Sequence, residues 1–173
     1  MTLDEQIADA EARGREERMA AAGVPARYLK LAHEDRDESL PKGGLFITGP
    51  SGAGKTHLAV RIIRTHDGRF VNWPSLLFEW KLSFRSGGDA AIQRAMTAKR
   101  LVLDDLGSER PTDFAIDSAN VMISNRYEGN LPTIITSNLT LPQIGRVYGD
   151  RIASRIAEMG KSVTLTGDWR LKR

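Results

Sequence analysis

The stretch that decides the fold is Gly49-Pro50-Ser51-Gly52-Ala53-Gly54-Lys55-Thr56, which fits the pattern G-x-x-x-x-G-K-[ST] at every fixed position. The apolar run Leu45-Phe46-Ile47 precedes it, and a helical pattern begins near Lys55. A glycine-rich loop between a strand and a helix is the context in which this pattern forms a phosphate-binding P-loop. A glycine turn before an ordinary helix would not need Lys-Thr directly after the last glycine. Binding of ATP or GTP is therefore the first expectation.

Each part of this loop has a role in holding phosphates. Glycines let the backbone approach closely, successive N–H groups form an anion nest, and the helix N-terminus adds partial positive charge. Lys55 is expected to reach the β- and γ-phosphates, and the Thr56 hydroxyl to bind Mg²⁺. His57 follows on the same helix. We place residues 49–57 in the nucleotide-binding segment.

The composition fits a single cytoplasmic domain. With 173 residues the chain is long enough to bury a core. It has no cysteine, which excludes disulfides and thiolate metal sites. No run approaches the roughly 18 apolar residues of a membrane span, and the start Met1-Thr2-Leu3-Asp4-Glu5 lacks the pattern of a signal peptide. These features predict a cytoplasmic protein without a membrane partner.

Charge is distributed unevenly along the chain. The formal net charge is +3, but residues 1–38 hold ten Asp/Glu and six Lys/Arg, a net of −4, so the remainder carries +7. A basic body on a nucleotide-binding fold suggests a phosphate-rich partner such as nucleic acid. A solvated basic face accounts for the charge alone equally well.

The order of elements predicts an α/β fold. Residues 1–42 read as a helical leader and linker, and 43–173 as the ATPase domain. The leader carries a thin apolar stripe of Leu3, Ile7 and Ala10. The alternatives are that this stripe docks on its own domain, that it docks on a partner, and that the helix frays in solution. Strands are expected at 45–47, 69–72, 100–103, 133–136 and 162–165, and helices at 2–22, 25–31, 55–65, 74–84, 90–98, 113–127, 141–147 and 151–159. Such alternation implies a mainly parallel sheet covered on both faces.

A second motif, Leu101-Val102-Leu103-Asp104-Asp105, is an apolar strand that ends in two acids about fifty residues after Lys55. It reads as a Walker B element. Asp104 would hold the Mg²⁺ shell, and Asp105 would orient or deprotonate the attacking water. The alternative is that one carboxylate, Asp105 above all, caps the next helix.

Three polar residues further along are candidates for contact with the γ-phosphate. Asn138 follows the next strand, where it would contact the phosphate or the lytic water, or merely shape a turn. Arg155 lies four residues after Arg151 on a predicted helix, and a guanidinium suits a phosphate because it donates two parallel hydrogen bonds. An ion pair with Glu158 or plain exposure is the competing account. Arg170 is a further candidate near the C-terminus.

Taken in order, these motifs resemble a known family. Gly-Pro-Ser-Gly-Ala-Gly-Lys-Thr-His-Leu-Ala, Leu-Val-Leu-Asp-Asp-Leu-Gly, Arg126-Tyr-Glu with Pro132-Thr-Ile-Ile-Thr-Ser-Asn, and Gly-Asp-Arg-Ile-Ala-Ser-Arg are similar to segments of the DnaC/IstB-type AAA+ ATPases, the helicase loaders and transposition ATPases. The resemblance covers about residues 23–170. It implies a P-loop AAA+ fold with a five-stranded parallel sheet of order 5-1-4-3-2, flanked by helices.

The same resemblance assigns roles to several residues. It makes Asn138 sensor 1, Arg155 the arginine finger that reaches a neighbouring subunit's ATP, and Arg170 sensor 2. The segment 23–28, with Val24 and Tyr28, matches the stretch beside the adenine, which favours ATP over GTP. The chain departs from typical relatives in its short leader and in a lid that is reduced or absent, so we expect a minimal version of the family.

A basic segment follows Trp80. Lys81, Arg85, Arg94, Lys99 and Arg100 lie there with a single acid, Asp89. Related ATPases contact single-stranded DNA from this region, and we hypothesise that Lys81 and Arg85 contact phosphates while Phe84 stacks a base. The alternative is that Phe84 belongs to the core.

These observations favour a Mg²⁺-dependent AAA+ ATPase that forms homo-oligomers with ATP, binds single-stranded DNA and loads a replicative helicase. A transposition ATPase acting with a transposase fits the residues equally well. A small-molecule phosphotransferase would need an acceptor pocket and a basic lid, and the sequence between Asn138 and Arg155 carries no such insertion. A slowly hydrolysing ATP-sensing adaptor is a third alternative, because Asp105 reaches a shorter distance than the commoner Glu.

Overall fold

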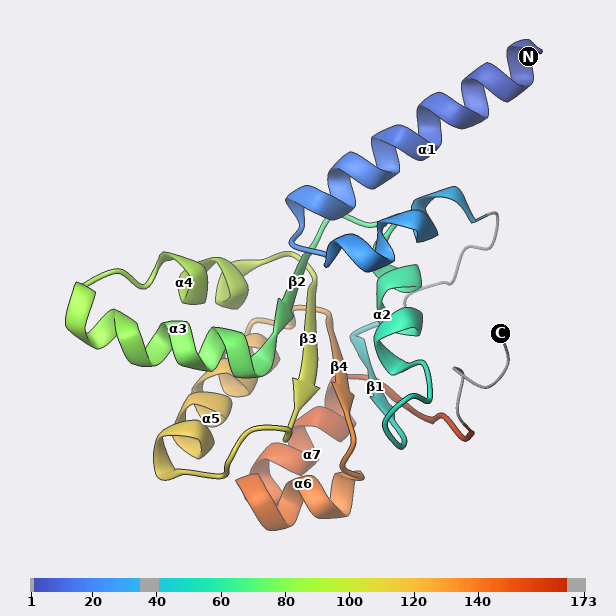
Figure 1. The fold of residues 1–173 in the computed structure, drawn as a ribbon. Helices are drawn as coiled ribbons and strands as arrows, with labels where there is room; N and C mark the ends of the chain where they lie inside the picture. The colour runs from blue at the N-terminus through green and yellow to red at the C-terminus, as the bar shows by residue number, and fades with distance from the viewer. Residues whose placement is uncertain (1, 35–40, 168–173) are drawn as a thin grey trace.

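In the computed structural model, which describes residues 2–34 and 41–167, five parallel strands form one sheet (Figure 1). The strands are β1 (Gly44–Thr48), β2 (Arg69–Asn72), β3 (Leu101–Leu106), β4 (Thr133–Ser137) and β5 (Lys161–Thr164). Their order across the sheet is β2-β3-β4-β1-β5. This is the expected 5-1-4-3-2 order read from the opposite edge, so the predicted α/β fold with a five-stranded parallel sheet is confirmed.

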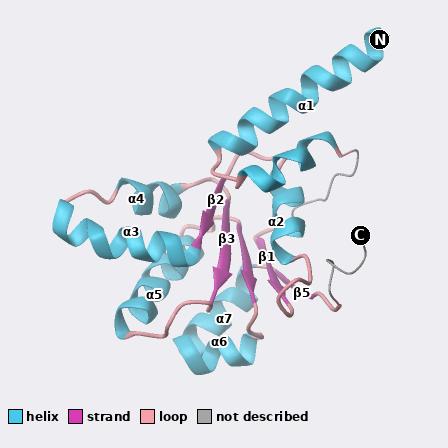
Figure 2. Ribbon diagram, in the orientation of Figure 1, coloured by secondary structure: helices cyan, strands magenta, loops and turns pink. Residues whose placement is uncertain are grey.

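The helices lie close to their predicted positions (Figure 2). They are α1 (Leu3–Ala21), the 3-10 helix η1 (Ala26–His33), α2 (Lys55–Ile63), α3 (Trp73–Ser86), α4 (Ala90–Thr97), α5 (Asp113–Glu128), α6 (Leu141–Tyr148) and α7 (Asp150–Met159). The main difference concerns β3, which was expected to end at residue 103 from its apolar run or at the two acids from the second motif. It continues through both acids to Leu106, because a bulge keeps them in the strand.

Side chains alternate between two cores along the central strands. Phe46 of β1 and Leu103 of β3 pack under the layer of α3, α4, α5, α6 and α7, whereas Ile47 and Val102 pack on the opposite face against α2 and η1. This period of two is the pattern of a sheet that is buried on both faces. Because the strands are parallel, their carboxyl ends form one edge of the sheet, where β1 and β4 end in register with Thr48 opposite Ser137.

The leader contributes to the second core through its C-terminal part only. Met19 of α1 is 2% exposed and Leu31 of η1 is 1% exposed, and both belong to the cluster that includes Ile47. Figure 1 shows α1 projecting from the body, with Leu3 71% and Ile7 50% exposed. The apolar stripe at the start of the leader is thus not docked on its own domain.

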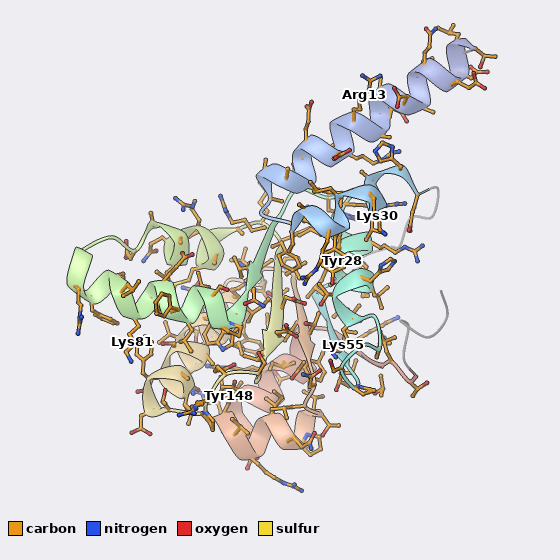
Figure 3. The ribbon with its side chains drawn as sticks, in the orientation of Figure 1. Arg13, Tyr28, Lys30, Lys55, Lys81 and Tyr148 are labelled. Atoms are coloured by element: carbon orange, nitrogen blue, oxygen red, sulfur yellow. The ribbon has the colours of Figure 1, made fainter. Side chains whose placement is uncertain are left out.

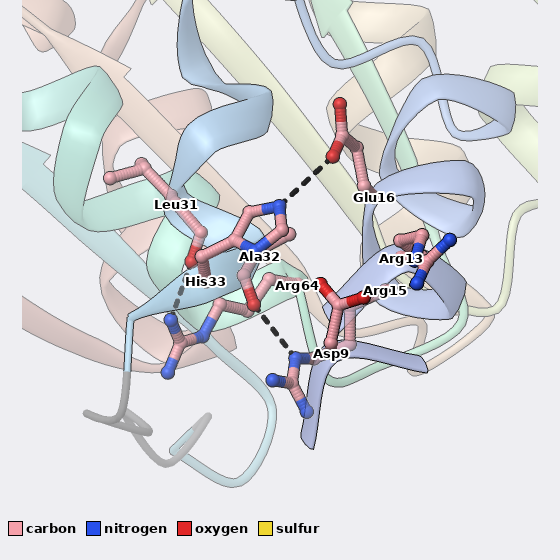
Figure 4. Close-up of polar contacts among 8 residues, drawn as sticks. All are labelled: Asp9, Arg13, Arg15, Glu16, Leu31, Ala32, His33 and Arg64. Atoms are coloured by element: carbon pink, nitrogen blue, oxygen red, sulfur yellow. Dashed lines mark hydrogen bonds and ion pairs between the residues drawn. The ribbon is translucent and has the colours of Figure 1, made fainter. Parts of the chain in front are cut away.

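Hydrogen bonds hold η1 between α1 and α2 (Figure 4). Arg15 of α1 donates to the carbonyl of Ala32 at 2.9 Å, and Arg64, just after α2, donates to the carbonyl of Leu31 at 2.6 Å. These contacts matter because η1 carries side chains that line the cavity described below. Among residues 2–34 and 41–167, no helix combines the length and the apolar character that crossing a membrane requires.

Candidate nucleotide-binding site

The glycine-rich loop lies between β1 and α2 at the carboxyl edge of the sheet. Gly49 has φ +148°, and a Cβ atom at this position would lie 2.3 Å from the carbonyl oxygen of Leu165, so only glycine fits there. Gly54, with φ +90°, is the N-cap of α2 and makes no side-chain capping bond. The first turn of α2 therefore presents its backbone N–H groups to the loop, the arrangement that binds phosphate in P-loops.

Lys55 is held in place by three acceptors. Its Nζ donates to the carbonyl oxygens of Gly49 at 2.9 Å and Pro50 at 2.8 Å, and to Oδ1 of Asn138 at 2.6 Å. Burial lowers the pKa of Lys55, while the carboxylates of Asp105 and Asp104 oppose that shift. The ammonium group thus links the loop to the end of β4, and Asn138 lies where the sequence placed it, beside the candidate phosphate site.

Both acids of the second motif lie in a bulge of β3. Leu103 pairs with Ile135 and Leu106 with Ser137, so Asp104 and Asp105 together face the single residue Thr136 of β4. Asp105 has φ +64°, a left-handed conformation that few non-glycine residues adopt. A bulge of this kind redirects side chains, and it explains why Asp105 lines the cavity although its neighbour is buried.

Thr136 connects the two acids through one hydroxyl group. Its Oγ1 accepts a hydrogen bond from the backbone N–H of Asp105 at 2.9 Å and donates to Oδ1 of Asp104 at 2.8 Å. Burial raises the pKa of Asp104, which is 3% exposed, and the hydroxyls of Thr136 and Thr56 act in the opposite direction. Sequence reasoning missed Thr136; a polar residue at the end of the apolar run of β4 is the signal that could have identified it.

Thr56 and Asp104 fit a magnesium site. Thr56 Oγ1 lies 2.9 Å from Asp104 Oδ1. This contact is a hydrogen bond from the hydroxyl to the carboxylate, and both groups are hard oxygen ligands of the kind that Mg²⁺ prefers. The chemistry of the two residues therefore fits a Mg²⁺ site between the P-loop helix and β3.

A cavity of about 720 Å³ opens beside these groups, a size within the range of about 300–1,000 Å³ typical of ligand sites. Figure 3 shows Tyr28, Lys30 and Lys55 on the same side of the molecule. The lining residues are Arg27, Tyr28, Lys30, Ser51, Gly52, Gly54, Lys55, Thr56, His57, Asp105, Ser108 and Asn138. Expected members of this set include Tyr28 and His57, and Arg27 belongs to the segment 23–28 that was expected beside the adenine, whereas Lys30 and Ser108 were not anticipated.

Two expected adenine contacts differ in position. Tyr28 lines the cavity, with the guanidinium of Arg27 4.9 Å from the centre of its ring. Val24 is 5% exposed and lies in the core cluster with Met19 and Phe70, outside the cavity lining. The difference arises because Gly23, with φ +91°, turns the chain between α1 and η1 and leaves Val24 pointing inward.

Arg155 lies apart from this cavity, on α7. Its guanidinium donates to Ser124 Oγ and, at 3.2 Å, to Glu128 Oε1, both on α5, and its Cζ atom lies 5.4 Å from the centre of the Tyr127 ring. The ion pair is thus with Glu128 and not with Glu158, the partner considered from sequence. Arg170 is outside the residues that the structure describes.

The predicted DNA contacts lie on α3, distant from Tyr28 and Lys55 (Figure 3). Lys81 and Arg85 are exposed. Phe84 is 73% exposed and makes an edge-to-face contact with Phe114, with ring centres 5.9 Å apart. The alternative that Phe84 belongs to the core is therefore wrong, because α3 turns this side chain toward solvent.

Comparison with known proteins gives a family match. The family model described as IstB-like ATP binding protein matches residues 37–162, which include both motifs and Asn138. No curated protein sequence matches the chain significantly.

Solved structures with the same fold come from replication proteins. The DnaC helicase loader is 32% identical, with a TM-score of 0.65, over 73% of this chain and 80% of that one. DnaI is 24% identical, with a TM-score of 0.66, over 92% and 85%. The AMPPCP-bound DnaA from Aquifex aeolicus is 23% identical, with a TM-score of 0.58, over 75% and 42%. The last two, at these identities, show the fold alone.

Proposed function

Because the chain belongs to the family of IstB-like, DnaC-like AAA+ ATP-binding proteins, we propose that it hydrolyses ATP with Mg²⁺ and acts as a helicase loader on single-stranded DNA. The observation that carries the proposal is that Lys55, Asn138 and Asp105 line one cavity, while the buried Asp104 accepts a hydrogen bond from Thr56, another residue of the lining. A cation, an amide and two carboxylates are the groups that a bound nucleoside triphosphate needs around its γ-phosphate.

Each of these side chains takes one role. Lys55 exchanges its carbonyl partners for the β- and γ-phosphates, and Asn138 orients the γ-phosphate or the water that attacks it. Asp105 accepts a proton from that water or aligns it. Thr56 and Asp104 would hold Mg²⁺, which neutralises developing phosphate charge when bound. Tyr28 stacks on or beside the adenine.

Arg155 completes the site of a neighbouring subunit in this proposal. Its place on α7, outside the cavity of its own chain, supports a role in trans. A guanidinium supplied by a neighbour would stabilise the charge of the transition state. Hydrolysis would then require assembly, and Glu128 would have to release Arg155 when the neighbour binds.

DNA would bind through α3. Lys81 and Arg85 are exposed cations on one helix, and Phe84 on the same helix is 73% exposed. Backbone charge neutralisation with an aromatic platform is the usual mode of binding single strands. The DnaC relative is a helicase loader, and this favours a replicative helicase as partner.

The substitution Asp105→Asn tests the proposed chemistry. It keeps the size of the side chain and removes its ability to accept a proton, so ATP binding should persist while turnover is lost. A fluorescent ATP analogue measures binding, and phosphate release measures turnover. Hydrolysis at the wild-type rate would show that Asp105 is not the base, and loss of binding would show a role in holding the nucleotide instead.

A further inference from the structure

A half-buried carboxylate joins three elements beside the candidate site. Glu109 Oε1 accepts hydrogen bonds from Trp73 Nε1 at 2.8 Å and from the hydroxyl of Tyr148, and Oε2 accepts from the backbone N–H of Gly107 at 3.1 Å. Trp73 is fully buried and Tyr148 is 4% exposed. A carboxylate is the side chain suited to this place, because it has two oxygens and only accepts hydrogen bonds.

The three donors come from parts of the chain with different proposed roles. Trp73 is the first residue of α3, the helix that carries Lys81 and Arg85. Tyr148 is the last residue of α6, and only Gly149 separates it from α7, the helix of Arg155. Gly107 lies two residues after Asp105 in the loop that leaves β3. Figure 3 shows Tyr148 and Lys81 on separate helices.

The loop that receives these contacts also fixes the backbone of Asp105. The carbonyl oxygen of Asp105 accepts from the backbone N–H of Ser108 at 3.2 Å and from its hydroxyl at 2.8 Å. A displacement of Gly107 therefore changes the short turn in which Asp105 has its left-handed conformation. Through its hydrogen bonds Glu109 thus ties Trp73 of α3 and Tyr148 of α6 to the loop that holds this turn.

We propose that Glu109 is a positioning residue that couples α3 and the α6–α7 pair to the orientation of Asp105, so that DNA on one side and a neighbouring subunit on the other set the rate of hydrolysis. The inference rests on the function proposed above. It adds a route by which two distant contacts reach one catalytic carboxylate. Burial and the contact with Glu109 both raise the pKa of Tyr148, so its hydroxyl remains a donor at neutral pH.

Three substitutions separate the two links. Trp73→Phe removes the hydrogen bond from α3 to Glu109, and Tyr148→Phe removes the one from α6. Glu109→Gln interrupts both connections to the loop, because an amide has a single oxygen and cannot accept from the two helices on one side and from Gly107 on the other. Glu17→Gln, an exposed glutamate on α1, is the matched control. Circular dichroism and binding of an ATP analogue establish that each variant folds, and kcat and KM for ATP are measured with and without oligo(dT) at several protein concentrations.

We expect Glu109→Gln to lower the stimulation of kcat by oligo(dT) about tenfold, equivalent to about 1.4 kcal/mol, with KM for ATP and the affinity for oligo(dT) unchanged. Trp73→Phe should lose stimulation by DNA and keep the rise of turnover with protein concentration, whereas Tyr148→Phe should show the reverse.

Equal loss of both responses in Trp73→Phe and Tyr148→Phe, or full stimulation in Glu109→Gln, would overturn the proposal. A wild-type protein without ATPase activity, or without stimulation, would instead refute the proposed function. A change in KM alone would also overturn the proposal, since it would place Glu109 in nucleotide binding rather than in coupling. Measurements on the wild-type protein alone therefore distinguish a failure of the proposed function from a failure of the proposed role of Glu109.

Discussion

The hydroxyl group of Thr136 offers the most direct test of how the β3 bulge is held. Thr136 is fully buried, and its Oγ1 is the acceptor for the N–H of Asp105 and a donor to Asp104. Thr136→Val keeps the shape of the side chain and removes both hydrogen bonds. The N–H of Asp105 would then lose its partner, and Asp104 would keep only the hydroxyl of Thr56.

The expected loss can be estimated from these two bonds. A polar group left without a partner in the interior costs about 1–3 kcal/mol, as for the N–H of Asp105, and a single lost hydrogen bond costs about 1 kcal/mol, as for Asp104, so the two together cost roughly 2–4 kcal/mol of unfolding free energy. For a chain of this size each kcal/mol corresponds to a shift of roughly 2–4 °C in melting temperature. We expect the melting temperature of nucleotide-free Thr136→Val to fall by about 5–15 °C.

Two further variants make this test specific. Thr136→Ser keeps the hydroxyl and removes one buried methyl group, a change that costs about 1 kcal/mol. Thr164→Val places the same change on an exposed site of β5, where about 0.5 kcal/mol or less is expected. Urea unfolding followed by circular dichroism ranks the variants. If Thr136→Ser is less stable than Thr136→Val, packing and not the hydroxyl holds the bulge.

Three other predictions concern the buried charges and the α3 surface. Burial raises the pKa of Asp104, so its ionisation destabilises the folded protein as pH rises through that raised pKa. Asp104→Asn should therefore raise the melting temperature at pH 8, and the gain should shrink at pH 4. A lower melting temperature of the variant at pH 8 would contradict this. The fully buried guanidinium of Arg126 donates to four carbonyl oxygens and one hydroxyl. Arg126→Met should therefore lower the free energy of unfolding, measured in urea, by more than about 3 kcal/mol. A decrease below about 1 kcal/mol would refute that role. Reversing Lys81 and Arg85 to Glu should lower the salt slope of the affinity for single-stranded DNA by about 1.4, about 0.7 for each lost phosphate contact, measured by fluorescence anisotropy; an unchanged slope would remove α3 from the DNA site.

The sequence alone predicted the parts of the fold that local patterns determine. Glycine spacing identified the loop around Lys55, and apolar runs that end in acids or amides placed Asp104 and Asn138 at the carboxyl edge of the sheet. Apolar residues marked the helices and strands clearly in the sequence, because a sheet covered on both faces buries one face of each helix and most of each central strand. The strand order followed from the resemblance to a family, since the pairing of distant strands leaves no mark in a single sequence.

Other features depend on contacts between residues far apart in the chain. The bulge at Asp105 requires Thr136 from another strand, and no local signal in Leu-Asp-Asp-Leu distinguishes it from a regular strand end. Burial of Val24 depends on the turn at Gly23 and on packing with Met19 and Phe70, and the latter two residues lie outside the segment 23–28. The pairing of Arg155 with Glu128 joins α7 to α5 across 27 positions. Assignments of this kind need the tertiary structure.

The central claim is that ATP is hydrolysed at a site shared between subunits. The measurement that tests it is ATP turnover per subunit against protein concentration, with and without single-stranded DNA, for the wild type, Arg155→Ala and the control Arg151→Ala, an exposed arginine on the same helix. We expect turnover to rise with protein concentration and with DNA in the wild type and in Arg151→Ala, and to stay low in Arg155→Ala. Turnover that is independent of concentration, of DNA and of Arg155 would contradict it and assign hydrolysis to the single subunit.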